Sequence, residues 1–452
     1  MDAKEQRRFN ILTKPIFPLL VKMSIPTIIG MLVTVIYNLT DTFFVGRLHN
    51  RSMIAAIGIV FSFVSIIQAI GFWYGYGSGN AMSKKIGEKN YAEAEIISSI
   101  GIAIAIITGI VIAIAASVFV VPLANLIGGS ASPDVLTFTV QYLHIIIISI
   151  PFSLYAVTIY NQLRLCGNVR DGMIGLLSGM LSNMLLDPLL MFPLNMGFIG
   201  AGYATLIGQI IGCIVLTVLA KSHGNIPISI KKVHCNKNRI YHILAGGLPN
   251  FSRQAITSVA LVLLNVTAAR YGESMIAALT ISSKIVALAF MIMIGWGQGF
   301  QPICAMNYGA KQYSRVKKAF ITTVAVGTVF LTIASIILYT FAEQCMQLMS
   351  TDEEVVSAGI KILMMQCFSL PLLGAFAVSS MFMQNIGNYF SALLISISRQ
   401  GFFYVPLLYV LPALYGKAGI YLLQPTSDFL SFLFAAVIVT RWYRRAPETA
   451  HS

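Results

Sequence analysis

The chain has 452 residues, of which 57% are hydrophobic and only 10% charged, and its mean hydropathy is +0.80. Soluble domains carry roughly 25% charged residues, so this composition excludes an ordinary soluble globular protein and indicates a chain that lies mostly in a lipid bilayer. The formal net charge is +14, and its meaning depends on where the basic residues lie.

Apolar stretches long enough to cross a bilayer follow one another along the whole chain. About 20 apolar residues in a helix span roughly 30 Å of hydrocarbon. We predict twelve such helices, at residues 18–45, 53–76, 94–122, 135–160, 170–193, 197–221, 242–268, 276–302, 316–344, 355–382, 389–412 and 418–441. Membrane β-barrels show short alternating segments instead of continuous apolar runs. The predicted fold is therefore all-α, a polytopic membrane protein with 12 transmembrane helices.

The chain contains two copies of one unit. The string Ser-Met-Ile-Ala-Ala at 52–56 returns at 274–278, and the glycine-rich segment 75–79 corresponds to 295–299. Six helices per copy is an even number, so both copies enter the membrane from the same side as a parallel 6+6 repeat, a common plan of two-lobed transporters. The predicted domains are an N-terminal six-helix lobe at 1–221, a basic cytoplasmic linker at 222–240 and a C-terminal six-helix lobe at 241–452.

Lysine and arginine gather in the loops expected on one side of the membrane. Of the 30 basic residues, 21 fall in the N-terminal segment and in the loops that share its side, and four fall in the opposite loops. Because cytoplasmic loops carry such an excess, we predict that both termini are cytoplasmic. The net charge then reflects topology and attraction to anionic lipid, and we expect no nucleic-acid partner.

Motifs for enzymatic chemistry do not occur in this sequence. The six cysteines are scattered without paired spacing, and the histidines form no metal-ligand pattern. No phosphate-binding loop ending in Gly-Lys-Ser or Gly-Lys-Thr is present. We therefore expect neither an enzyme nor a cofactor, and any active transport would draw its energy from an ion gradient.

Three aspartates, Asp41, Asp187 and Asp428, lie inside the predicted spans. A central aspartate costs about 2.5–3.5 kcal/mol even on insertion scales, so an intramembrane carboxylate first suggests a function. Asp41 on the first helix and Asp187 on the fifth are expected at similar depth, near the outer ends of helices that both run outward.

Polar residues accompany the two acids of the first lobe. Asn183 precedes Asp187 by four residues and therefore shares its helix face, and Thr205 on the sixth helix falls in the same layer. Tyr37 and Asn38 share the face of the first-helix aspartate. Hydrogen bonding between helices would also place such residues here, so a structural role stays open beside a functional one.

Carboxylates that converge in a low dielectric resist double ionisation. A proton relieves this, and so does Na⁺, which would use the neutral oxygens of Asn183 and Thr205 as further ligands because hard cations favour oxygen. The second repeat has Leu264 in place of Asp41. We therefore predict a single cation site, in the first lobe. It comprises Asp41, Asn183, Asp187 and Thr205, with Tyr37 and Asn38 in support.

The first helix resembles that of the MATE family, the multidrug and toxic compound extrusion proteins. The runs at 24–30 (SIPTIIG) and 37–46 (YNLTDTFFVG) carry this resemblance, and the segments at 77–79, 85–88 and 167–168 resemble further family landmarks. With the second-lobe counterparts the resemblance covers essentially the full chain. It looks closest to the bacterial branch that includes staphylococcal multidrug exporters.

The resemblance implies an antiporter that exports cationic or amphipathic drugs by alternating access, against inward flow of Na⁺ or H⁺. The coupling acid of related members maps onto Asp41, and their first-lobe cation site maps onto Asn183, Asp187 and Thr205. Pro26 lies below the acid on the first helix, where it would serve as a hinge or as a passive kink. Another branch of the family places coupling acids on helices 7 and 10, and those helices carry none here.

The expected partners are small-molecule cationic or amphipathic substrates and the lipid bilayer. We expect a monomer in the bacterial cytoplasmic membrane. The alternative is a flippase for lipid-linked oligosaccharides, whose pyrophosphate would favour a path lined by basic residues. Four basic residues within or near second-lobe spans keep this alternative open: Arg253, Lys284, Lys361 and Arg399.

Overall fold

The structure is a computed structural model that describes residues 2–47, 50–227, 234 and 236–445. At residues 38, 39, 41, 42, 45 and 445 it describes the backbone alone. Within these limits the regular structure is helical, without strands, and twelve helices are long and apolar enough to cross a membrane. The prediction of an all-α polytopic membrane protein is confirmed.

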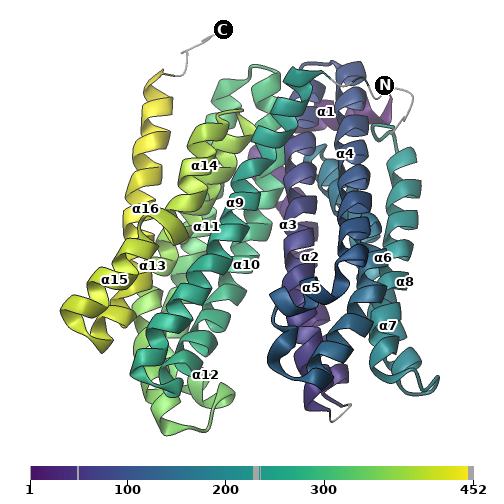
Figure 1. The fold of residues 1–452 in the computed structure, drawn as a ribbon. Coiled ribbons are helices and arrows are strands. Elements are labelled where there is room, and N and C mark those ends of the chain that lie inside the picture. The colour runs from purple at the N-terminus through teal and green to yellow at the C-terminus, as the bar shows by residue number, and fades with distance from the viewer. Residues whose placement is uncertain (1, 48–49, 228–233, 235, 446–452) are drawn as a thin grey trace. The chain divides into compact units, whose positions relative to one another are not determined.

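The helices of the first repeat are α2 (Ile16–Gly46), α3 (Arg51–Gly87), α4 (Tyr91–Val118), α5 (Val120–Leu126), α6 (Pro133–Leu165), α7 (Val169–Met191) and α8 (Gly197–Lys221) (Figure 1). Those of the second repeat are α9 (Lys237–Ala268), α10 (Glu273–Gly309), α11 (Tyr313–Thr340), α12 (Ala342–Met349), α13 (Glu353–Asn385), α14 (Tyr389–Ile397), the π-helical segment η4 (Ser398–Phe402), α15 (Tyr404–Tyr415) and α16 (Lys417–Arg445). The described residues also form short 3₁₀ turns, η1 (Gly129–Ala131) and η3 (Ala269–Tyr271).

The sequence repeat is also a repeat of structure. Helices α3 and α10 both have 37 residues, α4 and α11 both have 28, and α6 and α13 both have 33. Lys89 after α3 and Lys311 after α10 adopt the same left-handed conformation, with φ of 61° and 60°. Corresponding sequences therefore form the same helices and the same turns.

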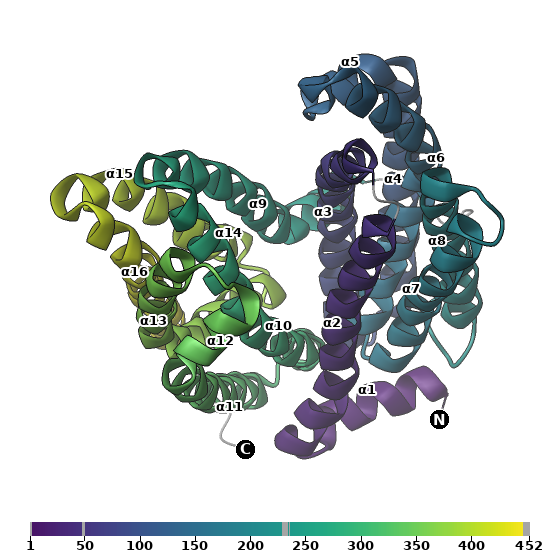
Figure 2. The same ribbon diagram turned by 90° about the horizontal axis from the view of Figure 1, so that it is seen from below.

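Three helices were not predicted from the sequence. The short helices α5 and α12 follow α4 and α11, and they are too short to cross a membrane. Helix α1 (Ala3–Thr13) is polar and lies across the helix ends of its unit instead of along the spans, as Figure 2 shows. Arg8 fixes α1 there, because its guanidinium donates to the carbonyl oxygens of Ile86 at 2.9 Å and Gly87 at 2.7 Å, at the end of α3.

The chain divides into two compact units. Unit 1 comprises residues 1–11 and 29–247, and unit 2 comprises residues 12–28 and 248–452. The predicted lobes follow the sequence repeat, whereas the units follow packing, so the two divisions differ at the first helix of each repeat. The beginning of α2 packs in unit 2, and the beginning of α9 packs in unit 1.

Glycines in α3 and α10 explain this exchange. A Cβ on Gly77 of α3 would overlap the carbonyl of Ile243 in α9, and a Cβ on Gly299 of α10 would overlap the side chain of Ser24 in α2. Hydrogen bonds fix both contacts. Trp73 Nε1 donates to the Leu244 carbonyl oxygen at 2.7 Å, and Thr27 Oγ1 donates to the Gly295 carbonyl oxygen at 2.7 Å. The glycine landmarks of the repeat therefore permit close helix packing.

Each unit has its own apolar interior. In unit 1 it is built by residues of α3 and α6, among them Val60, Leu143 and Leu154, each 0% exposed. In unit 2 one apolar cluster joins α9, α10, α13, α15 and α16. Many large apolar side chains on the helices stay exposed, for example Leu185 at 73%, as expected where a helix faces lipid.

Candidate functional site

The candidate ion site lies where α7 and α8 approach each other closely in unit 1. A Cβ on Gly179 would lie 2.9 Å from the carbonyl oxygen of Gly208, and a Cβ on Gly208 would lie 2.8 Å from that of Gly179. Small residues allow the backbones of membrane helices to approach in this way, whereas larger ones would hold them apart. This backbone contact brings the next turn of α7 against α8.

Asn183 and Thr205 meet beside this contact. Nδ2 of Asn183 donates to Oγ1 of Thr205 at 3.2 Å. Asn183 is only 3% exposed, and its Oδ1 accepts no hydrogen bond from any described residue. A buried amide oxygen without a donor is costly, and a bound cation would satisfy it.

Asp187 lies one turn beyond Asn183 on α7 and is 1% exposed. Pro188 follows it, and because proline has no N–H, the carbonyl of Met184 lacks its usual partner within the helix. This stretch of α7 therefore offers a carboxylate, an amide oxygen and a backbone carbonyl oxygen. Such oxygens suit a hard cation, so the residues fit Na⁺, and the carboxylate alone suffices for a proton.

The candidate ligands of this site are oxygen atoms. In the described part of the chain, His, Cys, Asp and Glu side chains form no group of three or more that would hold a metal ion. Transition metals favour imidazole and thiolate ligands. The candidate site combines the neutral oxygens of Asn183 and Thr205 with the carboxylate of Asp187, and these groups suit Na⁺ or a proton.

The other predicted site residues lie on α2. The side chains of Asp41 and Asn38 lie outside the residues that the structure describes. Tyr37 is half-buried. Pro26 lies inside α2 in the part that belongs to unit 2, which ends two residues later at Ile28. The roles of these residues in coupling and bending stay predictions.

Asp428, the remaining intramembrane acid, lies on α16 in unit 2. It is 2% exposed, and its Oδ1 is 2.7 Å from Nε of Arg399 in η4. Spacing along the sequence indicated no partner for Asp428, because the two residues lie on different helices. The sequence signal that could have identified this pair is that Arg399 and Asp428 carry opposite charges and lie in neighbouring spans of the second lobe.

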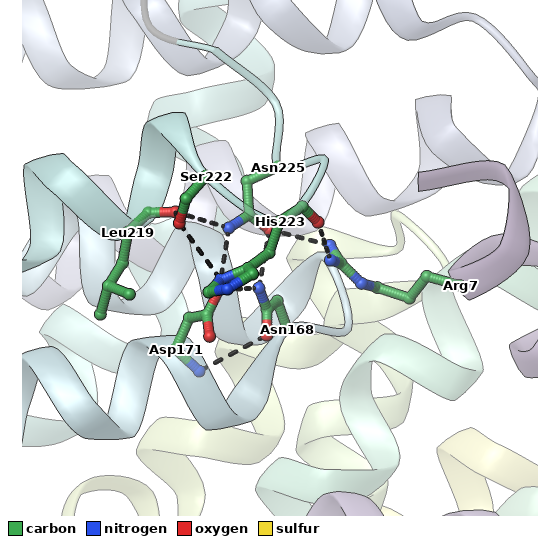
Figure 3. A network of polar contacts seen from close by, with 7 residues as sticks. All are labelled: Arg7, Asn168, Asp171, Leu219, Ser222, His223 and Asn225. Atoms are coloured by element: carbon green, nitrogen blue, oxygen red, sulfur yellow. Dashed lines mark hydrogen bonds and ion pairs between the residues drawn. The ribbon is translucent and has the colours of Figure 1, made fainter. Parts of the chain in front are cut away.

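A further polar cluster joins α1 to the start of α7 and the end of α8, and the sequence did not reveal it (Figure 3). Asp171 at the start of α7 is 5% exposed and accepts hydrogen bonds from Asn168 and, at 3.1 Å, from Asn225. Its carboxylate also lies 3.0 Å from Nδ1 of His223. Arg7 of α1 donates to Oδ1 of Asn225 and to the carbonyl oxygen of His223, both at 2.8 Å. The cluster therefore ties α1 to the loops that flank α7 and α8.

Burial affects two titratable groups at this cluster. It lowers the pKa of the Arg7 guanidinium, against the opposing effects of Cys166 and Asp171, yet a guanidinium stays charged at neutral pH. Burial also raises the pKa of the Cys166 thiol to about 12. A thiol in that state is protonated and unreactive, so these contacts describe a structural clasp and not a nucleophilic site.

Comparison with known proteins identifies relatives over nearly the whole chain. The family model described as MatE matches residues 26–189 and 249–410. The Multidrug export protein MepA of Staphylococcus haemolyticus (strain JCSC1435) is 28% identical over 418 residues, which cover 92% of this chain and 92% of that protein. The protein of the same name from Staphylococcus aureus (strain MSSA476) is 27% identical over 438 residues, 96% of each chain.

Solved structures share the fold. A crystal structure of MATE in the bent conformation covers 98% of this chain and 99% of its own, with a TM-score of 0.89 and 21% sequence identity. The likeness extends over both sequence repeats.

Proposed function

Because the chain belongs to the MATE family of multidrug and toxic compound extrusion proteins, we propose that it exports cationic or amphipathic drugs in exchange for Na⁺ or H⁺. The names of the curated relatives support export of multiple drugs. The observation that carries ion coupling is buried Asn183, which lies one turn from buried Asp187 on α7 and donates to half-buried Thr205, while its own Oδ1 has no donor among the described residues. We call the side-chain oxygens of Asn183, Asp187 and Thr205 the oxygen cluster.

The coupling ion acts on the charge of this cluster. Without an ion, the Asp187 carboxylate lies in a low dielectric, and Asp41 adds a like charge if it faces the same space as predicted. A proton neutralises the cluster, whereas Na⁺ balances its charge and takes Oδ1 of Asn183 and the hydroxyl of Thr205 as neutral ligands. Either ion removes the negative field that attracts a cationic drug. Ion and drug are therefore alternative occupants of the exporter.

Exchange needs more than competition. The drug and the ion must each bind differently to the inward-open and outward-open states, since a ligand with equal affinity for two states shifts nothing. Bending of α2 at Pro26 would link ion binding to that change, because proline removes one helical hydrogen bond.

The chain is a multi-pass membrane protein. We place it in the bacterial cytoplasmic membrane, as a monomer with both termini in the cytoplasm, and assign it small-molecule substrates without a cofactor or nucleic acid. Membership of a transporter family supports the view that it is not an enzyme.

Dye efflux from proteoliposomes tests this function. Vesicles are loaded with ethidium and given an inward Na⁺ gradient, an inward proton gradient or neither, with the membrane potential clamped. We expect one of the two gradients to accelerate efflux severalfold in the unaltered protein and not in Asp187→Asn. Lys284→Gln, a matched change at an exposed residue of α10, keeps the response. Equal efflux under all three conditions contradicts ion coupling.

The flippase alternative makes a different prediction in the same vesicles. It depends on basic residues in the second lobe, and Arg399 is already neutralised by Asp428 at 2.7 Å. Gradient-independent movement of a labelled lipid-linked sugar, without ethidium efflux, is the outcome that favours it.

A further inference from the structure

A buried ion pair in unit 2 has no part in the ion coupling proposed above. Both oxygens of Asp428 are occupied by hydrogen bonds. Oδ1 accepts from Arg399 Nε at 2.7 Å and from Gln424 Nε2 at 2.6 Å, and Oδ2 accepts from Ser369 Oγ at 2.8 Å. Asp428 therefore has little capacity left for a ligand, and its contacts hold the guanidinium of Arg399 in place.

Comparison of the two repeats shows how this arginine comes to lie there. The N-cap residues of α7 and α14, Asn168 and Asn388, are 220 residues apart. Leu190 and Leu411, which each lie against a glycine near the start of the next helix, are 221 residues apart. The second repeat thus has one extra residue between these points, and its π-helical segment η4 (Ser398–Phe402) accommodates it. Such single-turn π segments occur often at functional sites.

In unit 1 the corresponding contact, between α7 and α8, is made by the backbones of the two helices. A Cβ on Gly208 would lie 2.8 Å from the carbonyl oxygen of Gly179. Gly200 and Gly419, the glycines that contact Leu190 and Leu411, are 219 residues apart, so Gly208 matches Ser427, and Gly179 matches Arg399 at the offset of 220. Ser427 Oγ donates to the carbonyl oxygen of Arg399 at 2.6 Å. Helix packing at this point therefore needs no charge, because unit 1 achieves it with two glycines. The Arg399–Asp428 pair is an addition specific to unit 2.

Most donors of Arg399 are still available. Of its five N–H groups, only the one on Nε is hydrogen-bonded within the described part of the chain. The guanidinium lies over the ring of Phe290, 5.3 Å from the centroid, and 19% of the side chain is exposed. The two terminal amino groups thus present four N–H donors in one plane. Polar groups at membrane depth usually find partners, so this arrangement calls for an acceptor.

Depth and charge narrow the choice of acceptor. Arg399 follows the first residue of the span Tyr389–Tyr415 by ten residues, or about 15 Å at the helical rise, whereas lipid head groups stay at the interface. A planar guanidinium matches a carboxylate with two parallel hydrogen bonds. Because the Arg399–Asp428 pair is itself neutral, a ligand that also carries a cation avoids burying a net charge.

We propose that Arg399, positioned by Asp428, binds the carboxylate of zwitterionic amphiphiles and thereby extends the substrate range beyond simple cations. This assignment rests on the proposed export function. Its test compares two dyes with one ring system, rhodamine 110, which carries a free carboxylate, and rhodamine 123, its methyl ester. Binding of each dye to the purified protein in detergent is measured by fluorescence anisotropy, without any ion gradient.

The test variant is Arg399→Gln combined with Asp428→Asn, because removing the arginine alone would leave a buried carboxylate without its partner. We expect the dissociation constant of rhodamine 110 to rise about tenfold or more, the loss expected for a charge-assisted contact, and that of rhodamine 123 to change less than twofold. Arg399→Lys keeps the charge without the planar fork and should give an intermediate loss for rhodamine 110 alone. Lys284→Gln, the matched control, should affect neither dye.

Two outcomes overturn the proposal. Equal weakening of both dyes means that the pair only supports the structure, and unchanged binding of rhodamine 110 means that the guanidinium contacts no substrate. If the double variant unfolds, as its melting temperature would reveal, the same comparison of dyes in Arg399→Lys decides. Failure here leaves gradient-driven export of rhodamine 123 intact, so it is distinguishable from failure of the export function itself.

Discussion

Replacing Gly208 by alanine tests whether the close contact of α7 and α8 builds the ion site. The new Cβ would lie 2.8 Å from the Gly179 carbonyl oxygen and 3.0 Å from Cβ of Asn183. Carbon–oxygen contacts need about 3.3 Å and carbon–carbon contacts about 3.5 Å, so the helices must separate by about 0.5 Å. The Asn183–Thr205 hydrogen bond is already 3.2 Å long and would exceed the limit of about 3.5 Å.

The expected effect on stability is modest and the effect on transport is larger. Overpacking costs about 1–3 kcal/mol, and alanine recovers about 1 kcal/mol over glycine in a helix. Loss of the aligned oxygens should weaken ion binding about tenfold, the equivalent of about 1.4 kcal/mol. We therefore expect a small fall in melting temperature together with a shift of half-maximal efflux to about tenfold higher ion concentration.

Gly212→Ala is the matched control, on the same helix one turn away. Its Cβ would lie 3.5 Å from the Cα of Gly179, an ordinary contact. This variant should export dye like the unaltered protein, with an equal or higher melting temperature. Intrinsic fluorescence measures the melting temperature, and ethidium efflux from proteoliposomes measures export and its ion dependence. Unchanged ion dependence in Gly208→Ala, or equal loss in both variants, would refute the reasoning.

The remaining predictions concern single residues. Asp187→Asn should abolish gradient-driven efflux while membrane insertion persists, and so should Asp41→Asn; retained efflux in either variant removes that acid from the mechanism. Asp171→Ala should lower the melting temperature, because the buried amides of Asn168 and Asn225 lose the acceptor of their hydrogen bonds, at a cost of about 1–3 kcal/mol. The control Asp134→Asn changes an exposed residue and should leave the melting temperature unchanged. Equal melting temperatures of the two variants would contradict the clasp. In a variant that keeps Cys166 alone, maleimide at pH 8 should label only unfolded protein, because burial raises the pKa of this thiol to about 12. The same shift predicts that stability declines as pH rises from about 9, since only the unfolded thiol ionises there, and rapid labelling of folded protein would contradict it.

Hydropathy predicted the twelve spans because a bilayer imposes one requirement on each of them, a long apolar helix. It missed α1, α5 and α12, which do not cross the membrane and carry no such signal. It also missed the exchange of the first helical segments between the two units. That exchange depends on which backbone reaches Gly77 and Gly299, a property of tertiary packing that no local pattern contains.

Helical spacing placed Asn183 and Asp187 on one face and Thr205 at the same depth, and the structure brings Asn183 and Thr205 together. Partners on separate helices were harder to derive. The pairing of Arg399 with Asp428 depends on a π-helical turn, and a one-residue insertion becomes visible only when two structural repeats are compared.

The measurement that tests the central claim most directly is ion entry driven by drug exit. Because coupling between two ligands is reciprocal, an outward ethidium gradient must pull the coupling ion inward. Vesicles loaded with ethidium should take up radioactive sodium or acidify inside, and Asp187→Asn vesicles should do neither. Ethidium exit without movement of either ion would contradict the account.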